Sequence, residues 1–511
     1  MNPTEQSYAM KKTTFWALLF TAFTSIHCFG QPLSNIYSYP SEQGTNLHIR
    51  SLNASKDLIY HCTNTIYHTF LCQPDQMSFL NPSVSIYKYT IPLLADINGG
   101  VNYTVADMHV VGNVCYICGK MTSTVGSHRG GSGYVYDFED NGYFARIDLD
   151  SISKVFATIH PLADSTSRSL QPSPNIKISF CKLPYTKEVS KMCVSVSNGD
   201  TLIALVGRSS DSPAGPCLTA LKKDANGWDY QWIKVNDPLE YFTDVVFTSK
   251  SLFTASRFED DHYSLGVRFV NIAELFETYN STEFRTLNKF NTQGMYYGSV
   301  EPTWRLNDDP IHMVAIPGDN DVVLGHEGRF YPQGYDYFYE DICLYYISGD
   351  QSNVTMTNAF SLNCHPSEER FFFDMQYIPE QSCIGVLGSV LEGIFHDTYL
   401  SLFNWSTNVH MAHLGTDKAV AMDVHNGRVS LLGNRTSNNA LFHYREMSSL
   451  INQPPQCLLQ NMSYSRKIYG NAALTTSESI ISHTINYPQL NWCFNYRVTP
   501  TTVESSAVCH E

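Results

Sequence analysis

The segment with the residues best suited to binding chemistry is an aromatic run at residues 325–341. It contains Tyr331, Tyr335 and Tyr337, and Trp304 lies upstream in another expected loop. Aromatic rings with a few polar groups suit the binding of sugars or peptides, and loops on a rigid scaffold often carry binding sites. The sequence therefore predicts that these four residues contribute to a ligand site. A strand with one aromatic face would show the same alternation.

Motifs that specify a catalytic centre are absent from the sequence. It has no Gly-rich phosphate loop, no Gly-x-Ser-x-Gly nucleophile elbow and no His-Glu-x-x-His, which are the patterns of common nucleotide, esterase and zinc sites. The two acids of a glycoside hydrolase would come from distant parts of the chain, so no carboxylate pair is assigned. We expect no catalytic residue, no metal and no cofactor.

Cysteine spacing favours disulfides. The pairs with short separations, and one pair that could close a C-terminal loop, are Cys62 with Cys72, Cys181 with Cys193, Cys343 with Cys364, and Cys457 with Cys493. Such bridges are typical of exported proteins, although the sequence does not fix their connectivity. Cys115 and Cys118 form a C-x-x-C, but in a strand-like run they face opposite sides of a sheet. A redox or zinc role is therefore not expected.

The first residues resemble a secretory signal peptide. Lys11 and Lys12 precede an apolar run at 15–26, and Cys28 and Gly30 place small residues before Gln31. This order of basic, apolar and small residues predicts cleavage after residue 30. The apolar run is shorter than the roughly 20 residues that span a bilayer. We expect no membrane span, and export across the inner membrane to the periplasm or the cell surface.

Composition favours an all-β chain. Aromatic residues make up 13% of the 511 residues and charged residues 16%, against a usual charged share of about 25%. Few charges with many Tyr and Phe suit short strands joined by turns. The formal net charge of −15 argues against nucleic acid, which needs a basic footprint. It remains compatible with neutral or cationic ligands.

One pattern recurs along the chain: an alternating strand, a tight turn, a second apolar strand and usually a closing Gly. Its six copies are 107–119, 193–207, 244–255, 313–325, 374–388 and 421–433. Alternating apolar residues around Asn-Gly, Gly-Asn or Pro-Gly predict a β-hairpin. The closing Gly would admit a kink or a close neighbouring backbone.

Further strand pairs follow several copies, so each unit holds about four strands, the content of a propeller blade. We therefore predict one β-propeller domain over residues 31–511, with seven four-stranded blades. Six or eight blades remain open, and so do two β-sandwich domains.

The first copy carries a resemblance to a known group. Asp107-Met-His-Val-Val-Gly-Asn-Val-Cys-Tyr-Ile-Cys-Gly119 is followed by the strand Gly142-Tyr-Phe-Ala-Arg-Ile-Asp-Leu149. This resembles uncharacterised secreted, propeller-like proteins of the Bacteroidetes, which carry D-M-x-V-x-G-x-x-V-Y-x-C-G and then a similar strand. The resemblance implies export and a propeller-like fold, and it implies no activity.

These observations favour a non-catalytic binding or interaction protein of the cell envelope. A glycan, a peptide or a protein could be its partner. The alternative is a glycan-active hydrolase or lyase on a propeller scaffold, and a purely structural component of the envelope is a third possibility, because fold alone does not supply function.

Overall fold

The computed structural model describes the chain between residues 34 and 507, with gaps. The described ranges are 34–39, 45–53, 56–63, 66–72, 83–90, 101–130, 133–149, 178–183, 185–197, 199–224, 227–235, 239–258, 264–276, 285–291, 303–306, 311–331, 339–349, 354–362, 369–379, 382–392, 395–403, 409–413, 418–425, 428–435, 441–446, 459–460, 465–467, 475–477, 480–484, 490–492 and 497–507. The expected signal peptide at 1–30 lies outside them.

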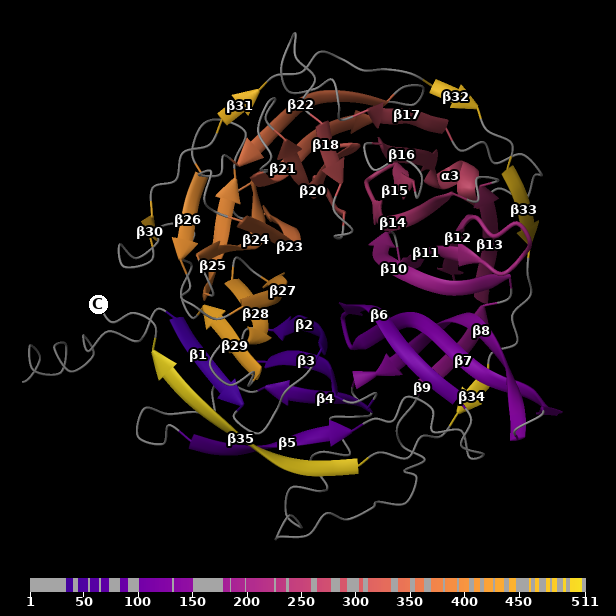
Figure 1. Cartoon of the computed structure of the whole chain (residues 1–511), viewed down its shortest axis with the longest axis horizontal. Coiled ribbons are helices and arrows are strands. Elements are labelled where there is room, and N and C mark those ends of the chain that lie inside the picture. The colour runs from indigo at the N-terminus through magenta and orange to yellow at the C-terminus, as the bar shows by residue number, and fades with distance from the viewer. Residues whose placement is uncertain are drawn as a thin grey trace, which may run out of the picture.

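Antiparallel strands dominate these ranges, so the expectation of an all-β chain is confirmed. The strands form six sheets that follow one another around a common centre (Figure 1). A short helix, α3 (Ile272–Leu275), follows one of the strands. Within the described ranges, no helix has the length and apolar character needed to cross a membrane.

Five sheets share one plan, in which consecutive strands step outward from the centre (Figure 1). From the centre outward, the first sheet contains β6 (Val101–Val111), β7 (Val114–Gly130), β8 (Gly133–Asp148) and β9 (Ile178–Leu183), and the second contains β10 (Thr186–Ser197), β11 (Asp200–Ser209), β12 (Pro216–Asp224) and β13 (Gly227–Val235). The third contains β14 (Glu240–Phe247), β15 (Ser251–Phe258), β16 (Ser264–Asn271) and β17 (Arg285–Asn291), and the fourth contains β18 (Thr303–Leu306) with β19 (His312–Ala315), then β20 (Asp321–Tyr331), β21 (Tyr339–Gly349) and β22 (Val354–Leu362). The fifth contains β23 (Glu369–Ile378), β24 (Cys383–Glu392), β25 (Phe395–Phe403) and β26 (Val409–His413).

The sixth sheet joins the two ends of the chain. It contains two four-stranded groups that share the outer strand β35 (Arg497–Ala507). The first group is β2 (Thr45–Asn53), β3 (Lys56–Thr63), β4 (Ile66–Cys72) and β5 (Ser83–Thr90). The second is β27 (Lys418–His425), β28 (Arg428–Asn434), β29 (Leu441–Glu446) and β1 (Ser34–Tyr39). Because β1 pairs with β29, the N-terminal strand completes a group built late in the chain.

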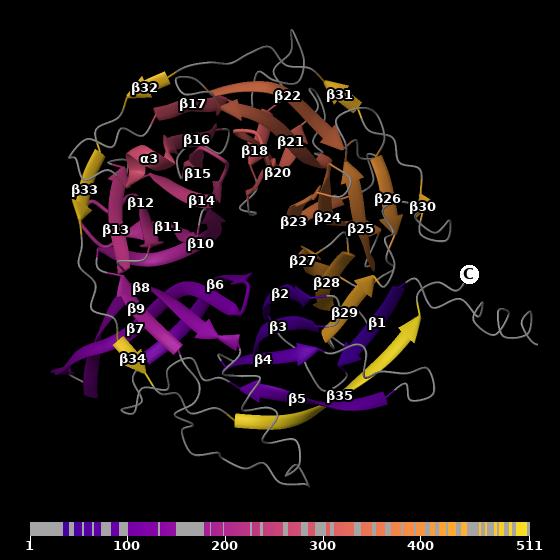
Figure 2. The same cartoon turned by 180° about the vertical axis from the view of Figure 1, so that it is seen from behind.

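The C-terminal strands run back around the outside of the ring (Figures 1 and 2). Each adds an outermost strand to a sheet, in reverse order of the chain. They are β30 (Leu459–Gln460) on β26, β31 (Ser465–Lys467) on β22, β32 (Thr475–Ser477) on β17, β33 (Ile480–Thr484) on β13, β34 (Leu490–Trp492) on β9, and β35 on β5 and β1. This segment covers edge strands that would otherwise expose unpaired backbone groups.

The hydrophobic core lies between the faces of neighbouring sheets. In β11, Ile203 and Leu205 pack with Tyr116 and Phe144 of the preceding sheet. Leu202, Ala204 and Val206 face the other way and pack with Phe242 of the following sheet. Both faces of β11 are buried, which is why its sequence is a continuous apolar run rather than an alternating one.

Each of the six sequence copies contributes two antiparallel paired strands, the first and second of a sheet or group. Where the connecting residues are described, tight turns join the two strands, and Gly112, Gly199 and Gly318 have φ angles of 57°, 87° and 90°. This left-handed backbone region is open to glycine at little steric cost. The hairpins expected from the turn residues are therefore present.

Candidate functional site: a polar pocket at the centre of the ring

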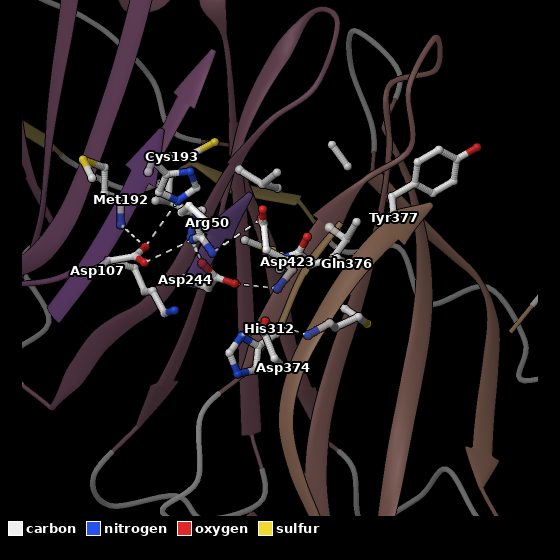
Figure 3. A pocket seen from close by; sticks show the side chains of 18 of the residues that line it. Arg50, Asp107, Met192, Cys193, Asp244, His312, Asp374, Gln376, Tyr377 and Asp423 are labelled. Atoms are coloured by element: carbon white, nitrogen blue, oxygen red, sulfur yellow. Dashed lines mark hydrogen bonds and ion pairs between the residues drawn. The ribbon is translucent and has the colours of Figure 1, made fainter. Parts of the chain in front are cut away.

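The inner strands place polar residues directly after a β-bulge. The register shifts immediately before Asp107 in β6, Lys191 in β10, Asp244 in β14 and Asp374 in β23. A bulge adds one unpaired residue, bends the strand and re-aims neighbouring side chains. All four side chains line one pocket at the centre of the ring, and Figure 3 shows the three aspartates around it.

Glycine in the second strand makes room for these bulges. A Cβ on Gly119 would lie 1.9 Å from the carbonyl oxygen of Thr104, and one on Gly207 would lie 1.9 Å from that of Glu188. A Cβ on Gly388 would lie 2.6 Å from the carbonyl oxygen of Phe371, and one on Gly433 would lie 2.1 Å from that of Lys418. The close backbone approach expected at the closing Gly is confirmed at these positions. At Gly325 the nearest atoms belong to side chains instead.

Three aspartates join the inner strands of consecutive sheets, and we call them the clamp aspartates. Each carboxylate accepts the N–H of the residue that follows it, at 2.7–2.9 Å. Its second oxygen accepts an N–H from the next inner strand. These bonds join Asp107 to Met192 (3.1 Å), Asp244 to Met313 (2.5 Å) and Asp374 to Met422 (2.9 Å). The clamp aspartates are therefore part of the framework that shapes the pocket.

The pocket is a cavity of about 300 Å³, near the lower end of the usual size of ligand sites, about 300–1,000 Å³. Its walls come from the inner strands β2, β6, β10, β14, β19, β23 and β27. Charged groups from different sheets meet there, together with backbone-bonded Gln376 and the aromatic ring of Tyr377. Such a concave polar site is the default position for a ligand.

Two cationic side chains, Arg50 and Lys191, line the pocket, and Arg50 forms ion pairs with its carboxylates. Arg50 of β2 lies between Asp107 at 3.8 Å and Asp423 of β27 at 3.7 Å. Its guanidinium also donates to the carbonyl of Ile49 at 2.9 Å. The side-chain ammonium of Lys191 has no hydrogen-bond or ion-pair partner among the described residues. It instead lies in the combined field of the clamp aspartates.

The surroundings shift the pKa values of these groups in opposite directions. Burial alone would raise the pKa of Asp107, but Lys191, His109 and Arg50 outweigh it and hold that pKa well below its usual range. Burial raises the pKa of Asp244 to about 7, against the opposing effect of Lys191. Burial also raises the pKa of Asp374. Asp244 and Asp374, which lie farther from Arg50, thus hold a proton more readily than Asp107 does.

Lysine and histidine complete the lining. Burial opposes charge on Lys191, but the three clamp aspartates together raise its pKa. His109 Nε2 lies 3.5 Å from Asp107 Oδ2. His312 Nδ1 lies 4.0 Å from Asp374 Oδ1, and its ring meets Phe372 edge-on at 5.1 Å. Burial lowers the pKa of His312 to about 3, so this imidazole is neutral at physiological pH.

The arrangement can hold a small polar molecule by hydrogen bonds and charge. Each carboxylate oxygen has two lone pairs, so a clamp aspartate can accept from a ligand while keeping its backbone partner. Among the described residues, no group of three or more His, Cys, Asp or Glu side chains could hold a metal ion. Recognition by fixed charges is the chemistry that the pocket offers most directly.

Two of the four aromatic residues predicted from the sequence lie in described strands. Trp304 is in β18 rather than in a loop, opposite Phe330 of β20. Tyr331 is the last residue of β20, opposite Thr303. The structure thus puts Trp304 and Tyr331 on neighbouring strands, and their role in ligand binding stays a prediction. Tyr335 and Tyr337 lie outside the described residues, so their role stays a prediction.

The expected disulfide between Cys181 and Cys193 is wrong, because both are free thiols in the structure. Cys181 packs into the core between the sheets of β9 and β11, whereas Cys193 packs on the opposite face of the β10–β13 sheet. Burial raises the pKa of each thiol to about 12. The sheet itself separates the two sulfur atoms.

The other disulfide predictions meet different outcomes. Cys62 lies opposite Tyr67 and Cys72 lies opposite Asp57, at the two ends of the β3–β4 ladder. Disulfides need Cα atoms about 4–7 Å apart, so this register contradicts the pair. Cys343 lies in β21, but Cys364, Cys457 and Cys493 lie outside the side chains that the structure describes. Those pairings stay predictions.

The residues of the pocket were not predicted as a site, although a signal for them exists. Three of the six copies carry Asp at the same place in an otherwise apolar strand, namely Asp107, Asp244 and Asp374. A polar residue repeated at one register position would have indicated a shared location. Arg50 and Asp423 have no such signal, because they come from opposite ends of the described chain.

Comparison with known proteins leaves the family of the chain open. No model of a protein family matches it, and no curated protein matches it. One similar solved structure is MPT-4, a mannose phosphorylase from Leishmania mexicana in complex with phosphate ion. It covers 61% of this chain and 97% of its own, at 9% identity and a TM-score of 0.26. Values this low support no inference about this chain.

Proposed function

We propose that this chain is a seven-bladed β-propeller that binds a ligand in its central pocket without transforming it. The described strands support seven blades, because five sheets contribute one four-stranded group each and the nine-stranded sheet contributes two. Hydrophobic clusters between consecutive sheets support a propeller over two β-sandwiches. The pairing of β1 with β29 would close the ring.

The observation that carries the binding proposal is that polar groups of the pocket are fixed in place before any ligand binds. Its three clamp aspartates are already fixed by backbone N–H groups of two strands each. The side-chain ammonium of Lys191, by contrast, has no hydrogen-bond partner among the described residues. Polar groups fixed before binding lower the cost of ordering a complex. We keep export to the periplasm or cell surface as part of this proposal.

An enzyme is the second candidate, and one specific contrast favours it. Asp107 has a lowered pKa while Asp244, in the same pocket, has a pKa raised to about 7. Carboxylates whose pKa values diverge are the usual pair of base and acid in glycoside hydrolysis. The engagement of both oxygens of each aspartate with backbone N–H groups favours a structural and binding role instead.

A thermal-shift screen with a pocket-filling variant tests the proposal. Glycans, short peptides and small amines are added to the purified protein and to Ala315→Phe, because Ala315 lines the pocket. A ligand at about 100 times its Kd should stabilise the protein by roughly 2.7 kcal/mol. The shift should vanish in Ala315→Phe and persist in the matched control Ser127→Phe, which changes an exposed hairpin residue.

Each outcome of the screen has a defined meaning. A shift that survives in Ala315→Phe would place the ligand outside the pocket and overturn the proposal. No shift with any compound would also overturn it. Product formation from a stabilising glycan, detected by chromatography after incubation, would replace the binding role with the enzyme.

A further inference from the structure

The charges in the pocket are out of balance. Four carboxylates line it, Asp107, Asp244, Asp374 and Asp423, against two cationic side chains, Arg50 and Lys191. Arg50 lies within 4.0 Å of Asp107 and Asp423. Asp244 and Asp374 form no ion pair with a Lys or Arg in the described part of the chain. Excess charge of one sign in a cavity is unfavourable, and it is relieved either by a proton on a carboxylate or by a counter-charge that enters.

His312 adds an unused polar atom on the same side of the pocket. Its Nε2 atom is buried and has no hydrogen-bond partner among the described residues, and the residue is 7% exposed. Figure 3 shows the imidazole beside Asp374. With the proton on Nδ1, which hydrogen-bonds the backbone of Phe373, Nε2 is an acceptor. Asp244, Asp374 and His312 therefore each contribute an acceptor to the lining of the pocket.

We propose that the pocket takes a small organic cation with a protonated primary amine, which Asp244, Asp374 and His312 would hold. An ammonium group has three N–H donors and no acceptor, so it matches this set of groups. The net charge of −15 also favours the approach of a cation. This inference rests on the proposed function, because it names the ligand class of the same pocket.

Ligand binding of this kind is coupled to a proton on Asp244. The other charged and titratable groups that line the pocket with it are Lys191 and Cys193 of β10, Asp107 and His109 of β6, His312 of β19, Asp374 and Tyr377 of β23, Arg50 of β2 and Asp423 of β27. Burial raises the pKa of Asp244 to about 7, so about a tenth is ionised near pH 6 and about nine tenths near pH 8. Affinity for the cation should rise roughly tenfold over that range.

Isothermal titration of the purified protein with matched probes tests the inference. Putrescine is compared with butanediol, which has the same length and no charge, and butylamine with butanol. We expect the amines to bind, the alcohols not to bind, and affinity to rise with pH. Binding should also release a proton, which appears as a dependence of the heat on the ionisation enthalpy of the buffer.

Two variants change the charge balance in opposite directions. Asp374→Asn should weaken putrescine binding at least about tenfold, since one of two excess carboxylates is lost. Lys191→Met removes a like charge, but it also removes the cation that lowers the pKa of Asp244; it should therefore tighten binding by a similar factor near pH 9, where Asp244 is ionised, and shift the rise in affinity to higher pH. Asp137→Asn, in the exposed hairpin of β7 and β8, is the matched control and should bind as the unchanged protein does. If Asp374→Asn does not fold, Lys191→Met still decides.

The outcomes separate this inference from the proposed function. Equal binding of putrescine and butanediol, or weaker putrescine binding in Lys191→Met near pH 9, overturns the cation inference. So does a glycan that binds in an Ala315-dependent way while every amine fails, and that result leaves the proposed function intact. If neither amines nor any compound of the wider screen bind, both fail.

Discussion

The Oδ2 atom of Asp374 accepts the backbone N–H of Met422 at 2.9 Å, although the two residues are 48 positions apart in the chain. Asp107 and Asp244 make the same contact with Met192 and Met313. Each contact ties one inner strand to the next around the centre. The groups that give the pocket its charge are thus also groups on which the fold depends, and substitutions there should affect both.

Asp107→Asn should destabilise the protein by about 2–4 kcal/mol. An Asn amide nitrogen would face a backbone N–H in place of an acceptor, and Arg50 would lose one of its two carboxylates. Unsatisfied buried groups cost about 1–3 kcal/mol, and uncompensated charges more. Urea unfolding measures the change. Asp137→Asn, at an exposed carboxylate, is the control, and equal midpoints for the two variants would contradict a structural role of the clamp.

Gly119→Ala should destabilise the protein by about 3 kcal/mol or more, because overpacking against fixed atoms is strongly unfavourable. The new Cβ would lie 1.9 Å from the carbonyl oxygen of Thr104 in the bulged strand. Gly126→Ala in the same strand is a matched control. There the nearest atom is a side-chain oxygen of Asp137 at 3.2 Å, which can move. Thermal unfolding compares the two, and a similar Tm would show that the bulge relaxes freely.

The buried ion pair between Glu240 and Arg268 should show strong coupling. The side chains are 0% and 2% exposed, so neither charge has water as a substitute partner. Replacing one partner, as in Arg268→Met, should cost about 3–5 kcal/mol, whereas the double variant Glu240→Leu with Arg268→Met should be close to neutral. A double-mutant cycle by chemical denaturation measures this. Additive effects of the single changes would refute the coupling.

Stability should fall with acid because buried histidines resist protonation. Burial lowers the pKa of His326 to about 4, while an unfolded His titrates near 6.5. Below about pH 6.5 the unfolded chain gains a proton that the folded chain does not, so stability is lost as pH falls toward 4. For His326 the loss is about 2–3 kcal/mol by about pH 4.5.

His326→Phe tests that assignment, because phenylalanine does not titrate. The difference in unfolding free energy between pH 7 and pH 4.5 should shrink by about 2 kcal/mol relative to the unchanged protein. His128→Phe replaces an exposed imidazole in the β7–β8 hairpin and should leave the difference nearly unchanged. An equal pH dependence in all three proteins would mean that His326 has the same pKa in the folded and unfolded chain, which contradicts the prediction.

Local sequence determined much of the architecture. Alternating residues around Gly112 and Gly199 predicted hairpins that the structure contains. The closing glycines predicted close backbone contacts, and Gly119 and Gly207 have them. These features depend on the period of two in a strand and on the backbone freedom of glycine, which are properties of a few neighbouring residues. The all-β class follows from the same short-range rules.

Tertiary structure decided which distant residues meet. Cys181 and Cys193 are near in sequence, yet a sheet lies between them. Arg50 and Asp423 come from opposite ends of the described chain, yet they lie 3.7 Å apart because β2 and β27 both reach the centre. Which face of a strand is buried, and which strands meet, depends on how whole sheets pack around the ring. By itself the sequence determined the strands and the bulge-accommodating glycines, whereas the pocket exists only because packing brings inner strands from the whole chain together.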